Sequence, residues 1–180
     1  MYSANKLRLL FLFILLILSL SEMSGANDQD PAAYSDALVV ASGAEDVRYM
    51  KYEGTDQISY RLQVDYPAHN VIETISQSLK DKGWEPLKED FLNPGLPSSH
   101  VRGWTNFTDA TRSPERRVHQ WLAQWENDQQ DIVCYGLRYE YPQDETPNLK
   151  SLHVHGIFVP APLAKEMRGI IPGYKSGSVE

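Results

Sequence analysis

The chain has 180 residues, 42% of them hydrophobic and 23% charged, which is typical of one globular domain and excludes a disordered or fibrous chain. Its formal net charge is −7, so we expect no nucleic-acid binding and no peripheral membrane binding, because both surfaces are negatively charged. The only cysteine, Cys134, cannot form an intramolecular disulfide, and we expect it to pack as a small apolar residue.

Residues 1–26 have the three parts of a signal peptide. Lys6 and Arg8 form a basic start, the twelve-residue run Leu9–Leu20 is apolar apart from Ser19, and small residues lead up to Ala26. We expect cleavage after Ala26 and export to the periplasm or the extracellular space. The alternative is an uncleaved N-terminal helix that anchors the protein, although a spanning helix needs about 20 apolar residues.

The rest of the chain divides into three parts. Residues 27–45 form a leader segment, in which Asp30 and Pro31 favour the start of a helix. Residues 46–160 form the main domain. For residues 161–180 we expect a C-terminal tail, with a short helix followed by disordered chain.

The start of the domain predicts a hairpin and then a helix. Apolar and polar residues alternate from Ile58 to Tyr66, which predicts a strand with one buried face, and Val47–Tyr52 pairs with it. The helix follows Pro67 and ends at Gly83. Its expected buried stripe consists of Val71, Ile72, Ile75 and Leu79.

Four further strands are predicted at about 100–109, 116–126, 131–141 and 151–159, with short polar connections that favour an antiparallel meander. The predicted fold class is therefore α+β: a curved antiparallel sheet with one main helix packed across one face. Alternation gives this sheet an aromatic face, which the helix covers, and a largely polar face. We interpret the aromatic residues of the covered face as core rather than as a sugar-stacking surface, namely Trp121, Trp125, Tyr135 and Tyr139.

The helix begins after Tyr66-Pro67-Ala68 and ends at Gly83-Trp84. With these motifs, residues 44–160 resemble small exported bacterial α+β domains that are uncharacterised. The motifs are structural, so the resemblance implies a fold and an exported location but no activity.

Two groups of polar residues are candidate sites. His153 and His155 are two residues apart on a strand and point the same way, which makes them weak candidates for metal binding that still need a third ligand. Arg61, Arg138 and Glu140 lie on the polar face of the sheet and form a possible binding face, although an ordinary solvated face with ion pairs has the same pattern.

The sequence has no Gly-rich phosphate loop, nucleophile elbow, zinc-protease motif or paired cysteines, and we expect no cofactor. We therefore predict a non-catalytic binding or accessory protein, whose partner is an envelope protein or a small ligand. The alternative is a small hydrolase or metal-dependent enzyme that uses the histidines of the last strand, with His119 or Asp109 in support. Asn106 begins a triplet that fits the glycosylation acceptor pattern.

Overall fold

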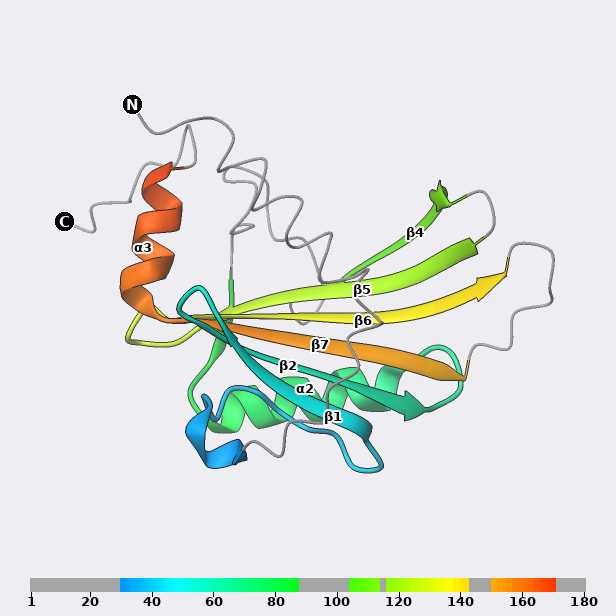
Figure 1. Cartoon of the computed structure of the whole chain (residues 1–180), viewed down its shortest axis with the longest axis horizontal. Coiled ribbons are helices and arrows are strands. Elements are labelled where there is room, and N and C mark those ends of the chain that lie inside the picture. Colours follow the sequence, from blue (N-terminus) through cyan, green and yellow to red (C-terminus); the bar gives the residue numbers. More distant parts are fainter. Residues whose placement is uncertain (1–29, 88–103, 114–115, 143–149, 171–180) are drawn as a thin grey trace.

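The computed structural model describes residues 30–87, 104–113, 116–142 and 150–170, with the backbone alone at 105–113, 116–118, 140–142 and 169–170. It confirms an α+β fold built on an antiparallel sheet (Figure 1). The elements, in chain order, are η1 (Pro31–Ala33), β1 (Glu45–Tyr52), β2 (Thr55–Gln63), α2 (His69–Asp81), β3 (Glu85–Pro86), β4 (Trp104–Ser113), β5 (Arg116–Glu126), β6 (Ile132–Pro142), β7 (Ser151–Val159) and α3 (Ala161–Ile170).

The strands are ordered β1-β2-β7-β6-β5, and both β4 and the two-residue β3 pair with the outer side of β5. The predicted meander is present from β4 to β7. However, the last strand lies between β2 and β6, so the N-terminal hairpin and the meander form one continuous sheet. The chain passes from β2 through α2 to the far edge, and the meander then returns to β2 (Figure 1).

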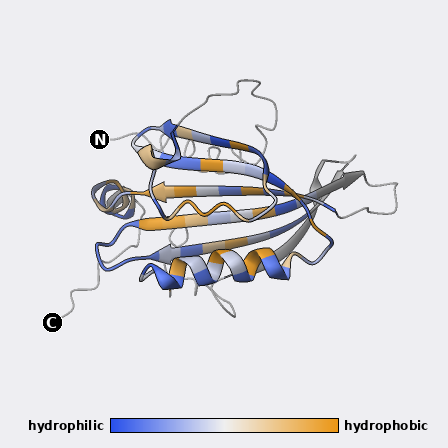
Figure 2. Cartoon of the chain, turned by 90° about the horizontal axis from the view of Figure 1, so that it is seen from below, coloured by the Kyte–Doolittle hydropathy of each residue, from blue (hydrophilic) through white to orange (hydrophobic). Residues whose placement is uncertain are grey.

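Helix α2 packs against one face of the sheet, as its stripe predicts (Figure 2). Its buried residues are Val71, Ile72, Ile75, Ser76 and Leu79. The helix ends at Gly83, where φ is +80° and the Trp84 N–H donates to the Leu79 carbonyl at 3.0 Å. Glycine adopts this left-handed conformation without steric cost, so the predicted stop is confirmed.

The aromatic residues of the covered face form the core. Trp125 and Tyr139 are fully buried, and Tyr135 is 1% and Trp121 5% exposed. The Trp104 indole N–H donates to the Ser76 hydroxyl at 2.9 Å, which joins β4 to the buried side of α2. The interpretation of these residues as core rather than a sugar-stacking surface is therefore confirmed.

The leader contributes to this core, which thus extends beyond the expected boundary at residue 46. Of the leader residues that the structure describes, from residue 30 on, only Pro31–Ala33 are helical, as a 3₁₀ turn, and the chain then runs beside α2 across the same face of the sheet (Figure 2). Its buried residues are Ala37, Leu38, Val39 and Ala41. These residues lack a helical period because they lie in an irregular segment with turns, packed beside α2 against the sheet.

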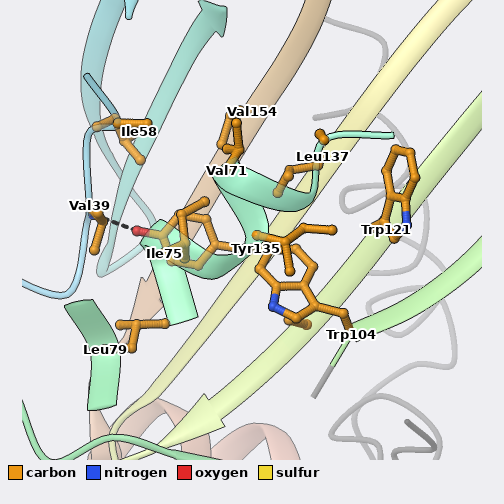
Figure 3. Packing of buried hydrophobic residues seen from close by; sticks show 14 of the residues in the cluster. Val39, Ile58, Val71, Ile75, Leu79, Trp104, Trp121, Tyr135, Leu137 and Val154 are labelled. Carbon is orange, nitrogen blue, oxygen red and sulfur yellow. Dashed lines mark hydrogen bonds between the residues drawn. The ribbon is translucent and has the colours of Figure 1, made fainter. Parts of the chain in front are cut away.

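Two tyrosine hydroxyls hold the leader. The Tyr135 hydroxyl donates to the Ala37 carbonyl at 2.7 Å and accepts from the Val39 N–H at 2.5 Å (Figure 3). The Tyr60 hydroxyl donates to the Val39 carbonyl at 3.2 Å. Burial raises the pKa of both tyrosines, so the hydroxyls remain protonated donors. These bonds satisfy backbone groups that would otherwise be buried without partners.

Helix α3 packs at one end of the opposite face of the sheet, which we call the distal face (Figure 1). Its fully buried Ala164 meets Ile132 and Val159 there. The Arg168 guanidinium binds the Glu126 carboxylate at 2.7 Å. The distal face is therefore apolar at this end, and only the rest of it has the polar character that alternation predicts. Residues 171–180 of the expected tail lie outside the described residues.

Candidate functional site

Side chains from three adjacent strands meet on the distal face. Alternation along β7 buries Leu152 and Val154 on the α2 side, so His153 and His155 lie on the other side. Their same-face placement was predicted and is confirmed.

The ladder then aligns the candidate residues of the neighbouring strands. Arg61 of β2 and Arg138 of β6 are both direct partners of His153. We call Arg61, His153 and Arg138 the basic row. Because neighbouring strands are about 4.8 Å apart, the Cα atoms of the two arginines lie about 10 Å apart with the histidine between them. His155 has Ser59 as its partner on β2.

An acidic residue that the sequence analysis missed contacts the basic row. Asp46 accepts a hydrogen bond from Arg61 Nη2. It lies where the β1–β2 register shifts between Glu45 and Arg48, and its φ is +52°. A β-bulge of this kind redirects a side chain, and an Asp followed by an alternating strand does not by itself predict one. The side chains of the pair are 47% and 49% exposed, so solvent screening keeps its contribution to stability small.

Both histidines are held in the neutral form. The pKa of His153 is lowered by burial and then by the positive charges of Arg138 and Arg61. Burial, followed by His153 and Arg138, lowers the pKa of His155 to about 4. At neutral pH the charge of the basic row therefore comes from its two guanidinium groups. The imidazoles can each donate one hydrogen bond and accept one.

The additional residues of the enzyme hypothesis are not brought to these histidines. His119 lies on the α2 side of β5, where its ring meets Tyr66 edge-on at 5.2 Å between centroids. Asp109 is in β4, three strand spacings or about 14 Å from β7. Within the part of the chain that the structure describes, no group of three His, Cys, Asp or Glu residues could hold a metal ion. A metal site on His153 and His155 would need a ligand from elsewhere.

Three other candidate residues have defined positions in the sheet. Glu140 is in β6 opposite Val118, and Asn106 is in β4 opposite Trp121, but their side chains lie outside the described residues. Cys134 lies on the distal face, half-buried and packed against the apolar cluster under α3. This position is compatible with the packing role expected of it.

No protein-family model, curated protein or solved structure matches this chain. The resemblance to exported α+β domains thus stays a prediction.

The predicted signal peptide, residues 1–26, lies outside the described residues. Among the helices of residues 30–87 and 150–170, none is long and apolar enough to cross a membrane.

Proposed function

We propose that this protein is an exported, non-catalytic binding or accessory protein whose ligand binds the distal face. The observation that carries the proposal is the basic row, in which the register places Arg61 and Arg138 on either side of His153. Side chains with this hydrogen-bonding capacity, aligned on a rigid sheet, are suited to ligand recognition.

The two faces of the sheet differ in what packs against them, and this difference supports the proposal. The α2 side is filled by the helix, the leader and the aromatic core. On the distal face, α3 contacts the apolar end, around Ile132 and Val159. The polar part, around His153, is built from three strands that the core holds in place from the other side. A site on strands is positioned more accurately than one on loops.

Export is the second part of the proposal. Its support is the basic, apolar and small-residue pattern of residues 1–26. Cleavage after Ala26 would leave every residue of the described core in place, because the core begins at Ala37. Mass spectrometry of the protein from the external fraction should give a chain that starts at Asn27. A full-length chain retained in the membrane fraction would instead favour the anchor.

The binding surface can be tested with the imidazole signals of the protein's own histidines. We expect low-molecular-weight fractions of the surrounding medium to shift the NMR signals of His153 and His155. The matched control is His69, which is exposed at the start of α2 on the other side of the sheet. Shifts confined to His69, or no shifts with any fraction, would contradict a ligand site on the distal face.

The metal-dependent alternative rests on the shared face and neutral state of His153 and His155. It predicts that Zn²⁺ binds the mature protein and that His153→Gln and His155→Gln each abolish the binding. Stoichiometric zinc binding that both variants lose would favour the enzyme and count against the non-catalytic proposal. Zinc binding unaffected by either substitution would exclude this pair as ligands.

A further inference from the structure

We propose that the ligand is a small molecule with one anionic group, a carboxylate, phosphate or sulfate, and that this group lies over His153 between the guanidinium groups of Arg61 and Arg138. This inference rests on the proposed binding function of the distal face and names the class of ligand. The register already places the three side chains in one row.

The geometry of the row suits an anion. A guanidinium group has five N–H donors in a fixed plane and binds the oxygens of a carboxylate or phosphate in pairs. With their Cα atoms about 10 Å apart, two long arginine side chains can converge on a group above the strand between them. The neutral imidazole of His153 beneath that point can donate a further hydrogen bond.

The electrostatics of the row point the same way. Burial is the largest cause of the lowered pKa of His153, and the charges of Arg138 and Arg61 lower it further, so the contribution of the two arginines to the potential at this ring favours negative charge. Asp46 of β1 lies on the side of β2 away from His153 and binds Arg61 through Nη2, so an anion over His153 must bind the other N–H donors of that guanidinium or take the place of the Asp46 carboxylate. The Asp46–Arg61 pair is half exposed, so a ligand anion can compete with this carboxylate at small cost.

The charge of the whole chain limits the size of the ligand. The net charge is −7, opposite in sign to the basic row. A long polyanion, such as a nucleic acid or an anionic membrane, would extend beyond the row and be repelled by the rest of the protein. A single anionic group is attracted locally without that penalty.

The test is a titration of the mature protein with inorganic phosphate, sulfate and acetate at constant ionic strength, followed by the imidazole signals. We expect at least one anion to shift His153 and His155 in a saturable way and to leave His69 unchanged. Arg61→Gln and Arg138→Gln should each weaken the binding at least tenfold, because each removes a charged hydrogen bond of about 1.5–3 kcal/mol. Which anion binds most tightly distinguishes a phosphate or sulfate ligand from a carboxylate.

The control variant is Lys80→Gln, which removes one positive charge from the exposed side of α2. Arg61→Lys keeps the positive charge but loses the planar guanidinium group. The anion affinity of this variant should therefore lie between that of Arg61→Gln and that of the unsubstituted protein. Weakening by Lys80→Gln equal to that by the arginine variants would overturn the proposal, since the effect would then be one of net charge. If extract fractions shift His153 while none of the three anions does, the anion inference fails and the binding function stands. If neither produces a shift, both fail.

Discussion

Gly156→Ala should destabilise the fold by disturbing the contacts that hold the leader, although Gly156 and the leader are far apart in the sequence. Gly156 lies on the α2 side of β7, and Tyr135 crosses it to reach the leader. A Cβ atom at this position would lie 2.8 Å from Tyr135 Cε1 and 2.9 Å from Ile58 Cγ2. Atoms at such distances must move, and both neighbours are buried in the core.

The size of the effect follows from what the tyrosine holds. Overpacking a core by one methyl group costs about 1–3 kcal/mol. If the Tyr135 ring shifts, its hydroxyl also loses the Ala37 carbonyl and the Val39 N–H, and leaving a buried polar group without a partner costs about 1–3 kcal/mol. Replacing a strand glycine by alanine returns about 0.4–1 kcal/mol through the unfolded chain. We therefore expect Gly156→Ala to lower the free energy of unfolding by about 1–5.5 kcal/mol.

Urea denaturation of Gly156→Ala, Tyr135→Phe and the double variant tests this reasoning. Because both changes release the same leader contacts, the double variant should lose at least about 1 kcal/mol less than the sum of the two single losses. The control is Gly156→Ala combined with Ser76→Ala, which removes the partner of Trp104 elsewhere in the core and should be additive. A loss below about 1 kcal/mol for Gly156→Ala, or additivity with Tyr135→Phe, would refute the link between this glycine and the leader.

Three further predictions concern the core, the histidines and the cysteine. Ile75→Ala deletes a fully buried side chain of α2 and should cost about 2–5 kcal/mol in urea denaturation, whereas a loss below about 1 kcal/mol would mean that the α2 stripe is not packed. The pKa of His155 falls from 6.5 to about 4 on folding. Between these two pH values the imidazole is therefore protonated in the unfolded chain and neutral in the native protein. The free energy of unfolding should therefore fall by up to about 3 kcal/mol from pH 7 to pH 4 through this group. His155→Gln should remove that part of the pH dependence, and identical pH profiles for the two proteins would contradict it. Cys134 should react slowly with a thiol reagent and faster in Ala164→Glu, which places a carboxylate at a fully buried position and releases α3. Fast labelling of the unsubstituted protein would show that the thiol is not packed.

The sequence predicts those parts of the fold that have a local period. The alternation from Ile58 to Tyr66 places Tyr60 and Leu62 in the core, and the stripe of Ile75 and Leu79 places α2 against them. The position of β7 beside β2 has no such signal, because strand partners are chosen by contacts far apart in the sequence. The burial of Ala37 also has no local signal in the sequence, because this residue lies in an irregular segment.

The candidate site was likewise predicted in part. Parity alone places Arg61, Arg138 and His153 on the same face, but their meeting in one row depends on the partner strands and their register. Asp46 was missed because a bulge turns it toward Arg61. The distal face was expected to be largely polar, yet Ile132 lies on it under α3. A short helix after residue 160 was expected, but the sequence analysis did not predict that it packs on this face, where Ile132 and Val159 meet Ala164.

The central position of β7 sets the order in which this molecule can fold. A chain that emerges N-terminus first presents β2 long before its inner partner, and Val39 precedes the tyrosine that holds its N–H by 96 residues. Until residues 151–159 are available, β2 has a ladder with β1 alone and the later strands have no connection to it. Such a high contact order implies slow, all-or-none folding after the chain is complete, since loop closure must precede any gain from packing.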